Sequence, residues 1–247
     1  MTDLKIVHDI ATEKGFRAHI SQNRFTIMRQ PVISVSTNAV LHDEWLVRFD
    51  SDTGLERILR PAEISGAISE LDLSMLRQAV KRLNDQPKRT AIAVNLSGAS
   101  FSDPAFERTL FATLAHLKAK PEKLLFELTE TWNLKDLQPA IRILNILRER
   151  GHNLCLDDVG AGAASLRYLR ALPADWLKID GEFVSGAASN AQELTVLKAV
   201  LGLRKGLGVK FIAEGIETQR LLDFAKDIGF DAVQGYILGA PEPEHPA

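Results

Sequence analysis

Polar residues recur near the ends of otherwise apolar, β-type segments along the whole chain. Segments such as LLFEL (124–128), LCLDD (154–158) and FIAEG (211–215) carry carboxylates among aliphatic neighbours. A carboxylate buried there without a partner would be costly, and several carboxylates close together would repel one another. A bound cation would remove both penalties. The polar residues at or near the ends of these β-type segments are Glu44, Asn95, Glu127, Asp157, Asp158, Lys178, Glu214, Glu217 and Gln234.

Apart from Lys178, this set consists of carboxylates and amides, without histidine or thiolate. Hard oxygen ligands of this kind favour Mg²⁺, Mn²⁺ or Ca²⁺ over zinc or copper. The carboxylates outnumber what one Mg²⁺ uses, so we predict two cations, which about 3.5–4 Å apart suit in-line attack of water on a phosphodiester. Lys178 would bind a phosphate oxygen or position the attacking water. The pattern therefore predicts metal-dependent hydrolysis of a phosphoester.

The same residues also have purely structural interpretations. The carboxylates could form strand-end ion pairs with Arg or Lys, Asn95 could form a turn, and Lys178 could be a counterion to the acids. Further along the chain, Glu63, Glu70 and Asp72 are expected as charges on a helix surface. Two further functions are consistent with this set of residues: a non-catalytic receptor, and a Mg²⁺-dependent lyase of enolase type.

The elements that must position these residues alternate between β-type and helical patterns. Eight β-type segments cover 25–34, 42–49, 90–97, 123–130, 153–159, 175–180, 209–216 and 231–238. Helical patterns cover 61–84, 104–118, 135–151, 163–171, 190–207 and 217–229. Eight strands, most followed by a helix, predict a (β/α)₈ barrel, whose active site lies at the carboxyl ends of the strands. The rival open doubly wound sheet would carry a glycine-rich first turn, which is missing here.

The first two strands are joined by too few residues for a crossover helix, so we expect them to be antiparallel. The predicted fold is therefore an α/β, modified TIM (β/α)₈ barrel with one antiparallel strand near the N-terminus. We expect a leading helix over 1–20, a single barrel domain over 21–243 and a frayed tail over 244–247.

Composition narrows the functional classes. The 247 residues carry 30 Lys and Arg against 32 Asp and Glu, and a net charge of -2 argues against a partner such as DNA or an RNA polymer. The one cysteine, Cys155, excludes an intramolecular disulfide and is expected as a small buried residue. No apolar run approaches the roughly 18 residues of a membrane span, and the first residues do not read as a secretory signal. A cytoplasmic protein is expected.

Eight motifs run in order along the chain: QPVI (30–33), DEWLVRF (43–49), VNLS (94–97), FELTET (126–131), LDDVGAGAASLRYL (156–169), LPADWLKIDGEFV (172–184), FIAEGIET (211–218) and QGYILGAPEP (234–243). Together they resemble the EAL-domain family, bacterial phosphodiesterases that linearise cyclic di-GMP. The resemblance covers about 25–243 and implies a modified TIM barrel. It also implies hydrolysis of cyclic di-GMP to the linear dinucleotide pGpG, with a catalytically weak or inactive cyclic di-GMP receptor as the alternative.

The resemblance further assigns roles. It implies Mg²⁺ or Mn²⁺ as cofactor, with Ca²⁺ binding and inhibiting, a homodimer, and a sensor or GGDEF domain upstream. Lys178 would orient the nucleophilic water, Glu217 and Gln234 would support the metal–water network, and Glu130 would anchor the loop after the fifth strand. The implied metal ligands are Glu44, Asn95, Glu127, Asp157, Asp158 and Glu214, and the implied dinucleotide-binding residues are Gln30, Leu46 and Arg48.

Three departures from the family pattern stand out. The Glu-Ala-Leu signature reads Glu44-Trp45-Leu46, and strand alternation turns Trp45 away from its neighbours, toward the helices. The loop DDVGAGAAS (157–165) stands where the family has a pattern like DDFGTGYSS. Smaller side chains thus replace larger or hydroxylated ones that could form hydrogen bonds, which favours the receptor alternative. We expect loop 158–166 to be ordered by metal and nucleotide, with self-association through 163–171. The segment TGLERILRPAEISG (53–66) is shorter than the phenylalanine-containing segment usual in the family.

Overall fold

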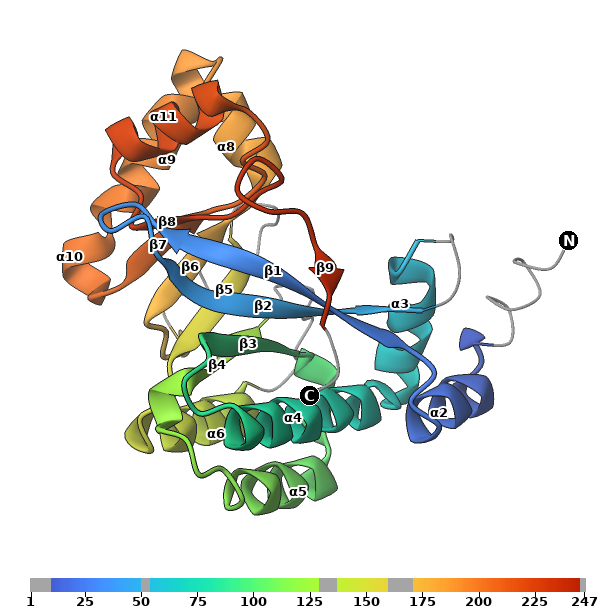
Figure 1. The fold of residues 1–247 in the computed structure, drawn as a ribbon. Helices are drawn as coiled ribbons and strands as arrows, with labels where there is room; N and C mark the ends of the chain where they lie inside the picture. Colours follow the sequence, from blue (N-terminus) through green and yellow to red (C-terminus); the bar gives the residue numbers. More distant parts are fainter. Residues whose placement is uncertain (1–9, 50–53, 129–136, 160–170, 245–247) are drawn as a thin grey trace, which may run out of the picture.

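The computed structural model describes residues 10–49, 54–128, 137–159 and 171–244, and its strands close into a barrel (Figure 1). Within these residues the sheet runs in the order β2-β3-β4-β5-β6-β7-β8-β1-β9, and β1 also pairs with β2, which closes the ring. The strands are β1 (Thr26–Ser34), β2 (Val40–Arg48), β3 (Ala91–Leu96), β4 (Leu124–Leu128), β5 (Leu154–Val159), β6 (Trp176–Ile179), β7 (Lys210–Ala213), β8 (Ala232–Val233) and β9 (Glu242–Pro243).

The antiparallel start of the barrel is confirmed. β1 runs antiparallel to β2, with Gln30 opposite Glu44, and antiparallel to β8 as well. The pairs from β2 round to β8 are parallel. A short turn at 35–39 joins β1 to β2, and Asn38 adopts a left-handed conformation (φ 55°) that asparagine tolerates. The chain therefore has the modified TIM barrel that its sequence predicts.

Helices cover the outside of the barrel, with α4, α5 and α6 on one side and α8, α9 and α11 on the other (Figure 1). The described α-helices are α2 (Glu13–Ser21), α3 (Glu56–Ser65), α4 (Ile68–Asp85), α5 (Pro104–Leu114), α6 (Gln138–Glu149), α8 (Gly181–Ala187), α9 (Ala191–Gly202), α10 (Arg204–Leu207) and α11 (Gln219–Ile228). Short 3₁₀ turns occur at η1 (Gly98–Ser102) and η2 (Pro121–Lys123). None of the helices in the described part of the chain combines the length and apolar character that crossing a bilayer requires.

The prediction of one helix over 61–84 was wrong, because the chain breaks there into α3 and α4. Gly66 follows α3 in the left-handed region (φ 76°), where a helix commonly ends at glycine. The predicted helix over 190–207 is likewise divided, into α9 and α10. α8, directly after β6, was not anticipated; it begins at Asp180, whose carboxylate accepts from two backbone N–H groups of the first turn.

Two apolar layers follow from the strand alternation. The outer layer lies between the sheet and the helices and contains Trp45, which is 2% exposed and lies under the Arg89 guanidinium. Trp45 is thus a packing residue, as its position in the strand predicts. The inner layer fills the barrel itself with six small or aliphatic side chains: Val32, Ala93, Leu125, Cys155, Ile212 and Ala232.

The end of the described chain departs from the expected frayed tail. Glu242 and Pro243 pair with β1 as β9, and the Glu244 backbone N–H donates to Ile27 O at 2.8 Å. The buried Glu244 carboxylate forms ion pairs with Arg89 at 2.7 Å and Arg82 at 3.2 Å. Glu244 is therefore part of the packed structure, and residues 245–247 lie outside the described residues.

Candidate active site

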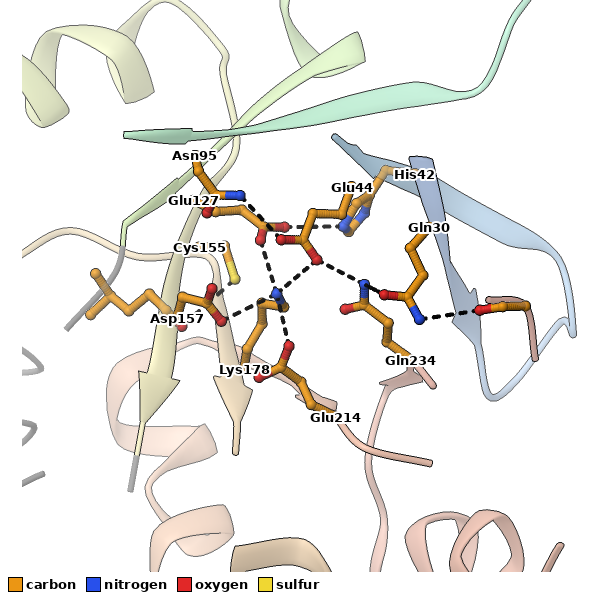
Figure 2. Close-up of polar contacts among 12 residues, drawn as sticks. Gln30, His42, Glu44, Asn95, Glu127, Cys155, Asp157, Lys178, Glu214 and Gln234 are labelled. Carbon is orange, nitrogen blue, oxygen red and sulfur yellow. Dashed lines mark hydrogen bonds and ion pairs between the residues drawn. The ribbon is translucent and has the colours of Figure 1, made fainter. Parts of the chain in front are cut away.

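The alternation of side chains along each strand explains why a group of polar residues lies above the inner layer. Side chains two residues apart on a strand point to the same face, so each polar residue stands directly above an inner-layer neighbour. Asn95 lies two residues after Ala93, Glu127 two residues after Leu125, and Asp157 two residues after Cys155. Glu214 and Gln234 are likewise two residues beyond inner-layer positions. The polar side chains consequently form one ring at the carboxyl ends of the parallel strands (Figure 2).

Lys178 occupies the middle of this ring. Its side chain is 1% exposed, and its Nζ contacts oxygens of four carboxylates. The distances are 3.1 Å to Glu44 Oε2, 3.0 Å to Glu127 Oε2, 3.2 Å to Asp157 Oδ1 and 2.9 Å to Glu214 Oε1. Burial lowers the pKa of Lys178, but the four carboxylates outweigh burial and hold that pKa well above its usual value. The lysine is therefore charged.

The ring holds more acid than this one ammonium group can neutralise. Burial raises the pKa of Glu127 and of Glu214 well above the usual range, against the opposing effect of Lys178. Burial would also raise the pKa of Glu44, but Lys178 and hydrogen bonds from Gln234 and Asn95 outweigh it and lower that pKa. Four carboxylates against one lysine leave a deficit of positive charge that a divalent cation would fill.

Two observations fit a cation to this ring. Carboxylate oxygens of Glu44, Glu127 and Asp157 lie within 4.8 Å of one another. Among the described residues, Asn95 Oδ1 and Glu127 Oε1 are buried oxygens without a hydrogen-bond partner. The Asn95 amide donates to Glu44 Oε1 at 3.1 Å, which leaves its carbonyl oxygen free to act as a ligand. Carboxylate and amide oxygens are the donors that Mg²⁺ and Mn²⁺ prefer.

Gln234 and Gln30 also reach the ring. Gln234 Nε2 donates to Glu44 Oε2 at 2.7 Å and lies 3.3 Å from Gln30 Oε1. Gln30 Nε2 in turn donates to the Gly239 carbonyl at 3.1 Å. These bonds orient the Glu44 carboxylate from the side opposite Asn95. Both glutamines therefore belong to the hydrogen-bond network around Glu44.

Three other predicted residues lie further out. Leu46 is half-buried and lines a cavity of about 240 Å³ beside Glu44. Arg48 is exposed, and its guanidinium donates to the neighbouring Val47 carbonyl at 3.0 Å rather than to the ring. Glu217 is exposed as well. The structure therefore does not bring Arg48 or Glu217 into contact with the carboxylates.

Some predicted features lie outside the described residues. They are Glu130, residues 160–166 of the loop, the segment 163–170 and the side chain of Asp158.

Two buried titratable side chains near the ring were not predicted as site residues. His42 lies two residues before Glu44 on the same strand face, and its Nε2 is 3.5 Å from Glu127 Oε1. Burial, followed by the charge of Lys178, lowers the pKa of His42 to about 4, so the imidazole is neutral. The strand periodicity that selected Glu44 would have found it.

Asp72 was expected on a helix surface, and this was wrong. It is 5% exposed on α4 and accepts hydrogen bonds from the Ser97 backbone N–H at 2.9 Å and from Ser100 Oγ at 2.6 Å. Burial raises its pKa to about 7, although both bonds oppose the shift. Its position four residues after buried Ile68 is the signal that could have found it. Asp72 and Glu63 both line the cavity beside Glu44.

The chain also matches one protein family and several known proteins. The EAL domain model matches residues 13–241. Cyclic di-GMP phosphodiesterase PdeB of Shewanella oneidensis is 31% identical over 234 residues, which cover 91% of this chain and 27% of PdeB. Cyclic di-GMP phosphodiesterase PdeL of Escherichia coli is 30% identical over 246 residues, or 96% of this chain and 67% of PdeL. The chain thus spans less than a third of PdeB.

Among solved structures, the c-di-GMP complex of PaMucR phosphodiesterase superposes with a TM-score of 0.80 at 30% identity. The match covers 89% of this chain and 97% of that one.

Proposed function

This chain belongs to the EAL domain family, and on that premise we propose that it is a divalent-metal-dependent phosphodiesterase that hydrolyses cyclic di-GMP to linear pGpG. The observation that carries the proposal is the buried ring in which Glu44, Glu127, Asp157 and Glu214 surround Lys178. The names of PdeB and PdeL supply the substrate. The orphaned oxygens of Asn95 and Glu127 support a cation in the ring.

The residues proposed to hold the cations are Glu44, Asn95, Glu127, Asp157, Asp158 and Glu214. Bound Mg²⁺ or Mn²⁺ would activate water and neutralise charge on the phosphodiester. The Lys178 ammonium, fixed by four carboxylates, would hold the attacking water by hydrogen bonding and offset the negative charge that develops on phosphorus oxygens. Gln234 would keep the Glu44 carboxylate in one orientation. Glu217 would join the network of waters at the mouth.

The dinucleotide is proposed to lie over the cavity beside Glu44, against Leu46 and Gln30, with Arg48 pairing with a phosphate. Arg48 is exposed and can turn from the Val47 carbonyl toward an anion. Calorimetric titration of Arg48→Ala should show weakened binding of cyclic di-GMP in Ca²⁺ with Ca²⁺ affinity retained. Exposed Arg24, on the turn before β1, provides the control variant Arg24→Ala. Unchanged nucleotide affinity in Arg48→Ala would remove Arg48 from the site.

Product analysis by chromatography tests the activity directly. The chain is incubated with cyclic di-GMP and either Mg²⁺ or Mn²⁺, and pGpG is expected as the product. Excess EDTA and the variant Glu44→Gln should each abolish cleavage, whereas Glu149→Gln, at an exposed position at the end of α6, should not. Cleavage that persists in EDTA would refute metal dependence. Nucleotide bound but uncleaved with both metals would instead support the receptor alternative, which the altered loop at 157–165 favours.

We also propose a homodimer, an upstream sensor or GGDEF domain, inhibition by Ca²⁺, and Glu130 as the loop anchor. Sedimentation tests the dimer. Replacement of Mg²⁺ by Ca²⁺ should stop turnover while nucleotide still binds. Glu130→Ala should lower metal affinity and turnover together.

A further inference from the structure

His42 is a polar side chain in a layer of the barrel that is otherwise apolar. It is 3% exposed and lies between Val32 on β1 and Ala91 on β3, its partners in the strand register. The inner layer beneath the ring otherwise consists of the six apolar side chains named above. An imidazole buried in such surroundings is costly unless its N–H finds an acceptor.

One acceptor is within reach. His42 Nε2 lies 3.5 Å from Glu127 Oε1, and neither atom has a hydrogen-bond partner among the described residues (Figure 2). The other oxygen of Glu127 accepts from Lys178 at 3.0 Å, so the carboxylate is held on one side only. The Glu127 side chain is 0% exposed. An approach of a few tenths of an ångström would bring the two orphaned atoms to the usual hydrogen-bond distance of about 3 Å.

We propose that His42 is a positioning residue that donates its Nε2–H to Glu127 Oε1 from inside the barrel and so fixes the Glu127 carboxylate for metal binding. A neutral imidazole carries one N–H, and placing it on Nε2 satisfies both orphaned atoms with one bond. Lys178 and His42 then hold the two oxygens from different directions, which limits rotation of the carboxylate. The proposal rests on the proposed function, since it assumes that Glu127 is a metal ligand.

Partners of ligating carboxylates are worth about 10–100-fold in metal affinity, and this sets the expected effect. Mn²⁺ alone is titrated calorimetrically into the nucleotide-free chain. His42→Leu, which keeps most of the volume but removes the donor, should weaken Mn²⁺ binding about 10–100-fold. His42→Gln, whose amide can donate, should retain more of the affinity than the leucine variant. His152→Leu is the control, because that buried imidazole contacts the Leu124 backbone carbonyl and no carboxylate.

A second measurement examines the imidazole in the wild-type chain itself. The ¹⁵N NMR spectrum of the Mg²⁺-loaded wild-type chain should show the Nε2–H tautomer for His42, with its signals assigned as those missing from His42→Gln. An Nδ1–H tautomer, or wild-type Mn²⁺ affinity in His42→Leu, would overturn the role of His42 alone. Absence of Mn²⁺ binding by the wild-type chain would overturn the metal site of the proposed function, and the role of His42 with it.

Discussion

Replacing Asp72 by asparagine should change how the stability of this barrel depends on pH. The Asp72 carboxyl is buried on α4 and holds the Ser97 N–H and the Ser100 hydroxyl, directly after the strand that carries Asn95. Burial raises its pKa from 3.8 to about 7 in the folded chain. The folded state therefore keeps a proton that the unfolded state has lost over most of this interval.

The sign and size of the effect follow from linkage. Because the folded pKa lies above the unfolded one, the stabilising contribution is complete below pH 3.8 and is lost as the pH rises to about 7. At about 1.36 kcal/mol per pKa unit, Asp72 should cost the folded state about 3 kcal/mol between pH 5 and pH 8. The amide introduced by Asp72→Asn cannot ionise, so the variant should gain about that amount relative to wild type over the same interval.

Urea denaturation followed by tryptophan fluorescence, in EDTA at pH 5 and at pH 8, measures this difference. Other titrating groups cancel because the two chains share them. Asp85→Asn is the matched control: it lies at the end of the same helix and pairs with Lys81 at 2.5 Å. Relative to the wild type, Asp85→Asn should show a much smaller change between pH 5 and pH 8 than Asp72→Asn does. A pH profile of Asp72→Asn that runs parallel to that of the wild type would refute the assignment of a raised pKa to Asp72.

Three further predictions concern the stability of the fold and its binding of metal. Glu244→Ala should lower the free energy of unfolding by about 2 kcal/mol, because the half-buried Arg89 guanidinium loses its charged hydrogen bonds to Glu244 and keeps only those to Asp43. A loss below about 0.5 kcal/mol in urea denaturation would contradict this. Gly181→Ala should weaken Mn²⁺ binding, because the added Cβ would lie 2.8 Å from the backbone of Gly215, next to Glu214. Gly202→Ala is the control, because the Cβ added there meets no neighbouring group within 4 Å. Mg²⁺ or Mn²⁺ at about 100 times Kd should stabilise the folded chain by about 2.7 kcal/mol and raise its Tm, and EDTA should reverse the rise. A Tm that does not change with added metal would count against the site.

The barrel and most of its ring were predictable from the sequence because both depend on local periodicity. Apolar runs of strand length, separated by helical patterns, specify a closed sheet whose carboxyl ends meet. The short connection before Val40 specifies the antiparallel start. Side chains two residues apart share a face, so Glu44, Asn95 and Glu127 were identified from their strands alone.

Tertiary structure decided what these patterns leave open. Which side chains touch depends on the stagger of strands round the closed barrel, and only that stagger brings Lys178 to four carboxylates and His42 beneath Glu127. The burial of Asp72 depends on which face α4 turns toward β3. Because the chain breaks at Gly66, the rotation of α4 about its axis is independent of that of α3. Arg48 is the last residue of β2 and Glu217 lies in the loop after β7. At these positions the course of the chain and the side chain's own rotamers, rather than the pleat alone, determine what a side chain contacts.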